Sequence, residues 1–269
     1  RTDKNIPLGE VRGRYEPVQN IQAFNFFDSA IGDDIKWCSA GYLGYGQKIF
    51  VTAKVNTPIS VNGKDIIEQY LLFTNSHDGS SAVQIMLTPI RLWCLNMLNA
   101  ARKNADSYIS FRHNQGVNSK LYTVPEILGF TKQKIEAEKL IYEVMFNTSV
   151  NDETIRKYIC DVFLSPKENE IVNEFNLHKP LLNRDNSAFE QVGISKQKLN
   201  ILTDVLEYTS DGIGQKQVEG TAWGMYNGIT GYFSNVKDYK NEEKQLEIGL
   251  MGADYNICNK ALNLALELC

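Results

Sequence analysis

The period of the hydrophobic residues changes along this chain, and that change constrains the fold more than any other feature. Between residues 35 and 90 apolar residues alternate with polar ones, and glycine-containing turns interrupt the alternation. From about residue 119 onward the spacing becomes helical. A period of two indicates strands and a period of 3.6 indicates helices. The sequence therefore predicts an α+β fold, with an antiparallel β-meander and flanking helices in residues 1–118 and a mostly helical region, residues 119–269, packed on the sheet as one continuous domain.

Two dipeptides carry the strongest turn signals of the predicted meander. The residues at 62–63 are Asn-Gly and those at 78–79 are Asp-Gly. Both favour a two-residue hairpin turn, because glycine takes a positive φ freely and Asn or Asp tolerates one. We expect the second turn to pair residues 69–75 with residues 82–88 in an antiparallel hairpin.

Helix signals flank the meander and fill the second half. A helix over residues 20–32 is expected to begin with Asn20 as its N-cap, and a basic helix is expected over residues 94–104. Asn151 is the expected N-cap of a later helix that stops at Pro166, and Gly212 is the expected end of another. The residues expected on the buried face of the first helix are Ile21, Phe24, Phe27 and Ile31.

Charge is distributed unevenly, although the chain as a whole has a net charge of −4. Residues 81–120 carry five basic and one acidic side chain, with Trp93, Tyr108 and Phe111 between them. Basic side chains with interleaved aromatics are typical of a groove for single-stranded nucleic acid. The alternative is a solvated helix face beside a strand edge. The basic residues of this segment are Arg91, Arg102, Lys103, Arg112 and Lys120.

The polar stretch TNSHDGSSA at 74–82 follows a hydrophobic strand and contains one of the three histidines. A catalytic triad is disfavoured here, because a turn points the side chains of adjacent residues apart. A two-residue turn does not need so many hydrogen-bonding side chains, so we expect the turn to present some of them to a polyanion or a partner. The residues expected to contact nucleic acid are Asn75, Ser76, His77, Ser80, Arg91, Arg102, Lys103, Arg112, His113 and Lys120.

Several kinds of chemistry lack a sequence signal. There is no P-loop, no dinucleotide-binding fingerprint and no metal-binding histidine motif, so we expect no cofactor, no metal and no assigned catalytic residue. Cys94 and His113 could form a thiol and its base, but the apolar neighbours of Cys94 favour packing. Five widely spread cysteines without a CxxC pair favour reduced thiols. No apolar run is long enough for a membrane helix, which favours a cytoplasmic protein.

Aromatic residues in the segment TAWGMYNGITGYF at 221–233 have two interpretations. Trp223, Tyr226, Tyr232 and Phe233 could stack on bases, but their spacing is explained more simply by one core-facing helical stripe.

Four stretches of the sequence stand out as motifs: GRYEPVQNIQAFNFFD at 13–28, YLLFTNSHDGSSAVQIMLTPIRLWCLNML at 70–98, SFRHN at 110–114 and EGTAWGMYNGITGYFS at 219–234. Together they resemble a family found on phages and plasmids and known only as a domain of unknown function. The order of elements is also similar to the core of annealing recombinases, in which a hairpin layer and a helix hold single-stranded DNA and the subunits form rings. The resemblance implies a mobile-element protein in the host cytoplasm, and the second likeness implies a homo-oligomer.

Three classes of function follow from these observations. The basic middle segment favours non-catalytic binding of single-stranded nucleic acid during recombination or replication of a mobile element. The acidic helical half favours an interaction protein that acts on a host or phage protein or in virion assembly. An enzyme of unassigned chemistry is the third alternative.

Overall fold

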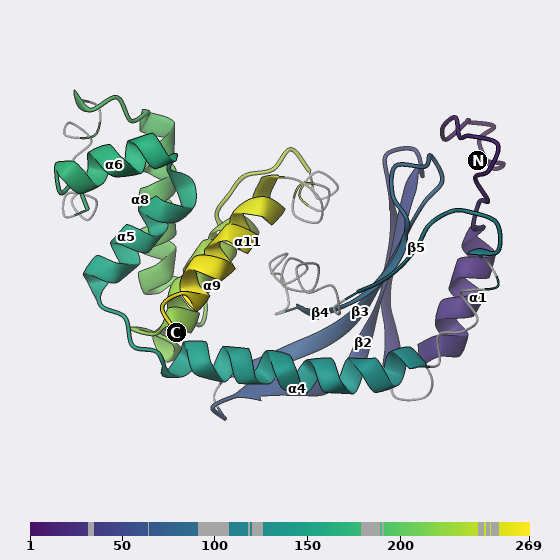
Figure 1. The fold of residues 1–269 in the computed structure, drawn as a ribbon, viewed down its shortest axis with the longest axis horizontal. Coiled ribbons are helices and arrows are strands. Elements are labelled where there is room, and N and C mark those ends of the chain that lie inside the picture. Colours follow the sequence, from purple (N-terminus) through teal and green to yellow (C-terminus); the bar gives the residue numbers. More distant parts are fainter. Residues whose placement is uncertain are drawn as a thin grey trace. The chain divides into compact units, whose positions relative to one another are not determined.

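The protein folds into two compact units (Figure 1). The computed structural model describes the chain except for residues 32–34, 64, 91–107, 118, 120–125, 179–188, 190, 242–244, 246–247 and 249–252. The first unit comprises Arg1–Ile59 and the described residues of 66–92 and 100–138. The second comprises Lys139–Cys269 and the described residues of Ser60–Asp65. The helix expected over residues 94–104 lies outside the described residues.

An antiparallel sheet dominates the first unit, as the α+β prediction requires. Within the described residues it has five strands in the order β1-β2-β3-β4-β5. Gln69 faces Pro89 and Thr74 faces Gln84 across β3 and β4, which confirms the predicted hairpin. The strands are β1 (Ile35–Leu43), β2 (Lys48–Val61), β3 (Asp65–Ser76), β4 (Val83–Ile90) and β5 (Tyr108–Phe111).

One face of the sheet is the core of the first unit. Alternate residues of β2, β3 and β4 point to this face, because successive side chains of a strand point to opposite sides. Phe73 and Ile67 are fully buried there, and the polar Gln69 between them is buried as well. The other buried apolar residues on this face include Ile49, Val51, Ala53, Val55, Leu71, Val83 and Ile85.

Helix α1 (Asn20–Ile31) lies beside β1, but its start and its rotation differ from the sequence prediction. Asn20 is the first helical residue and not the N-cap, and its side-chain Oδ1 lies 2.7 Å from His77 Nε2. Ala23 is fully buried and the Asp28 carboxylate accepts a hydrogen bond of 2.8 Å from Trp37 Nε1, and together these contacts fix which face of the helix meets the sheet. Ile21 is therefore 69% exposed, and its assignment to the buried face is wrong. The side chains of Phe27 and Ile31 lie outside the description.

The two predicted turns have different outcomes. Asn62 and Gly63 have φ values of 52° and 70°, so a tight turn with two positive φ angles joins β2 to β3 as predicted. Gly79 has a φ of 76°, but Asp78 does not take a positive φ. Residues 77–82 separate β3 from β4, so the predicted two-residue Asp-Gly turn is wrong.

The second unit is helical, and helix α9 (Ala222–Asn235) is at its centre. Every residue from Ala222 to Phe233 is buried, because α8 and α11 pack on α9 and α5 packs on both of those helices. This burial confirms the core interpretation of the aromatic stripe. The surrounding elements are the part of α4 (Glu126–Asn147) from residue 139, α5 (Asp152–Phe163), α6 (Pro166–Glu174), α8 (Lys196–Asp211), the 3₁₀ turn η3 (Gln215–Gln217) and α11 (Ala253–Leu266).

Helices α8 and α9 approach each other closely through glycine. A Cβ built on Gly228 would overlap Thr209 Oγ1 and lie only 2.8 Å from Thr209 Cβ. Thr209 cannot easily move, because its hydroxyl donates a buried hydrogen bond of 2.8 Å to the carbonyl oxygen of Val205. The absence of a side chain at position 228 is what permits this packing distance.

Helix ends in the second unit follow their sequence signals except at Pro166. Asn151 caps α5 by accepting a hydrogen bond of 2.8 Å from Thr154 N, and Gly212 ends α8, both as predicted. Pro166 does not simply stop α5. It is the first residue of α6, a helix that the sequence interpretation missed, and Ser165 forms a capping box with Glu168 at its start.

A buried polar bond connects sequence-distant parts of the second unit. Trp223 Nε1 donates a hydrogen bond of 2.8 Å to Asp65 Oδ2, across 158 positions of sequence. Trp223 is 1% exposed and Asp65 is 3% exposed. The turn between β2 and β3 therefore supplies an acceptor to the helical core, because residues 60–65 belong to that unit.

The described cysteines, Cys38, Cys160, Cys258 and Cys269, are all free thiols, as their spacing predicted. Cys94 lies outside the described residues. None of the helices in the described part of the chain is long and apolar enough to cross a membrane.

Candidate functional site

The segment that precedes α1 is fastened to the end of strand β3. Tyr15 Oη donates a hydrogen bond of 2.7 Å to the carbonyl oxygen of Ser76. Asn75 Nδ2 donates a bond of 2.9 Å to the carbonyl oxygen of Val18. Backbone groups of both segments are satisfied in this way, although the two segments are about sixty positions apart in the sequence.

The polar residues of the loop at 77–82 hold the loop in shape. Ser76 Oγ donates to the carbonyl oxygen of Ser81 at 2.7 Å and accepts from Ser81 N at 3.0 Å. Asp78 Oδ1 accepts from Ser80 N at 2.9 Å. The backbone N–H of His77 donates to the carbonyl oxygen of Gln47 at 2.7 Å, which joins this loop to the turn between β1 and β2. Several of the polar side chains of this stretch, among them Ser76 and Asp78, therefore form hydrogen bonds within the protein.

Burial decides which of the predicted contact residues can meet a ligand in this loop. Asn75 is 1% exposed and Ser76 is 0% exposed, so the expectation that the turn presents these two side chains is wrong. His77 is half-buried and Ser80 is exposed. Both remain accessible from solvent.

Two histidines add contacts between the start of α1, the loop at 77–82 and the end of β5. His77 Nε2 lies 2.7 Å from Asn20 Oδ1, and the ring of His113 stacks on Tyr15 with centroids 4.5 Å apart. Burial lowers the pKa of both histidines, and the nearby His113 lowers the pKa of His77 further. Through these contacts the start of α1 meets the loop at 77–82, and the segment before α1 meets the end of β5.

Three exposed arginines lie in the backbone segments that form the Tyr15–His113 stack. Arg14 precedes Tyr15 and Arg112 precedes His113, and the backbones meet because Glu16 N donates to the carbonyl oxygen of His113 at 3.2 Å. The backbone of Arg12 is also close, because its carbonyl oxygen accepts from Tyr15 N at 2.8 Å. The three side chains are exposed and form no ion pair with another described residue. We call Arg12, Arg14 and Arg112 the arginine surface.

The structure brings together only part of the predicted set. His77, Ser80, Arg112 and His113 lie near one end of the sheet, with the buried Asn75 and Ser76 below them. The sequence interpretation missed Arg12 and Arg14. Their signal was present in the run VRGRY at 11–15, but the balance of charge over residues 1–80 concealed it. The remaining predicted residues, Arg91, Arg102, Lys103 and Lys120, lie outside the described residues.

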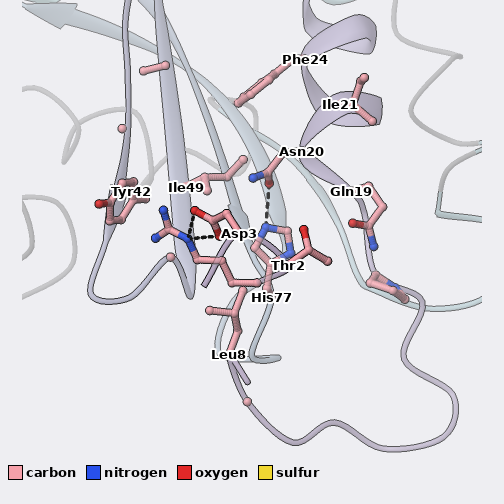
Figure 2. Close-up of a pocket in the computed structure, with 16 residues that line it drawn as sticks. Thr2, Asp3, Leu8, Gln19, Asn20, Ile21, Phe24, Tyr42, Ile49 and His77 are labelled. Atoms are coloured by element: carbon pink, nitrogen blue, oxygen red, sulfur yellow. Dashed lines mark hydrogen bonds and ion pairs between the residues drawn. The ribbon is translucent and has the colours of Figure 1, made fainter. Parts of the chain in front are cut away.

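A pocket of ≈ 810 Å³ opens beside the same loop (Figure 2). It lies between the start of α1 and the strands β1 and β2, and His77 and Gly9 contribute to its wall. Its lining combines polar groups of Gln19 and Asn20 with apolar groups of other residues. The apolar side chains of the lining include Leu8, Ile21, Phe24, Tyr42 and Ile49.

Two aspects of the pocket bear on ligand binding. The Arg1 guanidinium lies over the ring of Tyr42, 4.6 Å from its centroid, and forms an ion pair of 2.8 Å with Asp3. Among the described residues, no group of three or more His, Cys, Asp or Glu side chains is placed to hold a metal ion. The groups in the pocket wall are thus suited to stacking and to hydrogen bonding.

The chain belongs to the family described as Domain of unknown function (DUF932), whose model matches residues 7–251. This match spans both the loop at 77–82 and the arginine surface. Comparison with curated proteins gives no match, and comparison with solved structures gives none either.

Proposed function

Because the family has no assigned activity, we propose from the site itself that this protein binds single-stranded nucleic acid without catalysis. The observation that carries the proposal is the arginine surface, in which a backbone bond between Glu16 and His113 brings the segment of the exposed Arg12 and Arg14 to that of the exposed Arg112. Arginine suits this role because its planar guanidinium makes paired hydrogen bonds to phosphate. Its proposed setting is recombination or replication of a phage or plasmid in the host cytoplasm, in keeping with the resemblance of the sequence.

Exposed aromatic residues near the arginine surface support a single strand as the ligand. Tyr45 is 66% exposed and Tyr42 is 49% exposed, and they lie on the turn that follows β1 and near the end of β1. The bond between His77 N and the Gln47 carbonyl oxygen places that turn beside the loop at 77–82. Unpaired bases stack on aromatic rings, whereas the bases of a duplex are already stacked on each other.

Acidic groups in the same region limit the expected strength of binding. Asp78 and Glu16 are near the arginines, but their carboxylates accept backbone hydrogen bonds from Ser80 N and Gly116 N. They still reduce the local positive potential. We therefore expect binding that is strong at low salt and weak at physiological salt.

Fluorescence polarisation with labelled oligonucleotides across a salt series tests the proposal. The parent protein should bind single strands more tightly than duplex of the same sequence. Replacing Arg12, Arg14 and Arg112 with Gln should weaken binding to all sequences alike. It should also reduce the slope of log affinity against log salt by about 2, because each phosphate contact on a single strand contributes about 0.7.

A matched variant controls for net charge. The triple replacement of Lys157, Lys167 and Lys196 with Gln removes three exposed charges from the second unit and should leave the salt slope unchanged. If the parent does not bind single strands at low salt, or if the arginine variant keeps the parental slope, the proposal is wrong. Interaction with a host or phage protein would then be the better hypothesis.

A further inference from the structure

We infer that the pocket beside Asn20 accepts one unpaired base of the bound strand. This inference rests on the proposed function and deepens it, because it adds a base-specific contact to the phosphate contacts of the arginine surface. The pocket, its lining and its position each point to such a ligand.

The size of the pocket fits a nucleobase with its sugar. Its volume of ≈ 810 Å³ lies within the range of about 300–1,000 Å³ that is usual for small-ligand sites.

Flat and apolar surfaces form one part of the wall. Phe24 contributes an aromatic ring, and Tyr42 contributes a second ring on which the Arg1 guanidinium lies. Aromatic rings and guanidinium planes are the surfaces on which proteins stack unpaired bases. Ile21 is 69% exposed at the pocket, so an apolar ligand face would remove from water a side chain that the fold leaves uncovered.

Amide groups form the polar part of the wall. Asn20 Oδ1 lies 2.7 Å from His77 Nε2, which holds the Asn20 amide in one orientation, and Asn20 Nδ2 forms no hydrogen bond with another described residue. Figure 2 shows Asn20 directly above the His77 ring, with Ile21 and Phe24 on the same helix. An oriented amide can pair with the donors and acceptors on the edge of a base.

The pocket and the backbone of the arginine surface both adjoin the loop at 77–82. Gly9, in the pocket wall, packs against Asp78 so closely that a Cβ at position 9 would lie 2.7 Å from Asp78 Cβ. Val11, two residues later, contacts Gly79, and Arg12 follows it. A strand held by the arginines is therefore close enough for a neighbouring base to enter the pocket.

Oligonucleotides with and without bases provide the test. Polarisation binding is measured for a labelled single strand and for a fully abasic deoxyribose-phosphate strand of the same length, which carries the same charge. The parent should prefer the strand with bases by about tenfold, the size expected for a stacked base. Ile21→Ser should reduce this preference by about threefold or more without changing binding to the abasic strand. The matched control is Ile213→Ser, which alters an isoleucine that is 80% exposed in the second unit.

The outcomes separate this inference from the proposed function. If the parent binds both strands equally and the arginine variant weakens both, the pocket inference is wrong and the proposed function stands. If the parent prefers bases but Ile21→Ser leaves the preference unchanged, bases are recognised elsewhere and the pocket inference is again wrong. If neither strand binds at low salt, both the inference and the proposed function are overturned.

Discussion

Replacing Gly228 with Ala has two opposite effects on stability at the contact between α8 and α9: it raises helix propensity and it overpacks the contact. Alanine stabilises the interior of a helix by about 1 kcal/mol relative to glycine. At this position, however, the new Cβ would overlap Thr209 Oγ1 and lie 2.8 Å from Thr209 Cβ, in a buried contact. Overpacking of this kind costs about 1–3 kcal/mol and sometimes more.

The expected net effect of Gly228→Ala is a loss of about 1–2 kcal/mol in the free energy of unfolding, because overpacking exceeds the gain in propensity. Urea unfolding followed by tryptophan fluorescence measures it, since Trp223 lies in the same helix. A second replacement, Thr209→Ala, removes the overlapping hydroxyl and should restore part of the loss in the double variant. An increase in stability for Gly228→Ala alone would refute the reasoning.

Three further predictions concern acid stability, thiol reactivity and the N-terminal fastening. The hydrogen-bonded Lys198 lowers the pKa of Glu168 to about 2, so the ionised Glu168 should stabilise the fold fully above about pH 5 and lose this effect as the pH falls toward 2. Glu168→Gln should therefore be less stable than the parent by an amount that shrinks over that window, as measured by unfolding at each pH. A deficit that stays constant with pH would contradict this. In the native protein a thiol reagent should modify the exposed Cys38 quickly. Cys160 should react only after unfolding, because burial makes it inaccessible and raises its pKa to about 12. Peptide mass spectrometry distinguishes the two modified cysteines. Tyr15→Phe should lower the free energy of unfolding by about 1 kcal/mol in urea titrations, because a β3 carbonyl loses its donor, and a change below about 0.3 kcal/mol would count against the fastening.

Local patterns predicted the elements well where the same pattern also determines packing. The alternation from Ile49 to Val55 identified a strand because its apolar residues are the ones that meet the core. The turn at 62–63 was predicted correctly because both of its φ angles are positive. The aromatic spacing from Trp223 to Phe233 likewise indicated a buried helix, since the core surrounds that helix.

Distant contacts explain why the remainder could not be predicted from local patterns. The Asp-Gly signal at 78–79 was overridden because Ser76 and Ser81 bond to each other and a segment near Gly9 packs against the loop. The bond between Ser76 and Ser81 is local, but no short window of sequence contains both this loop and Gly9. The exposure of Ile21 has the same origin, because the rotation of α1 depends on a bond to β1.

The candidate site was predicted only in part for a related reason. Summing charge over a continuous segment identified Arg112 but not Arg12 and Arg14, which reach the same surface through the pairing of Glu16 with His113. The buried roles of Asn75 and Ser76 also depend on residues about sixty positions earlier. A sequence shows that polar side chains are present but not which partner each one has.

The bond between Trp223 and Asp65 determines how this protein can be divided into fragments. A fragment that begins at residue 139 would contain the helices of the second unit but not the Asp65 carboxylate, so Trp223 Nε1 would lose its acceptor inside an apolar core. A peptide that spans the turn between β2 and β3, supplied as a separate molecule, could restore that acceptor. The helical half should therefore fold more readily with residues 60–65 present than alone, which makes split-protein complementation a natural way to study it.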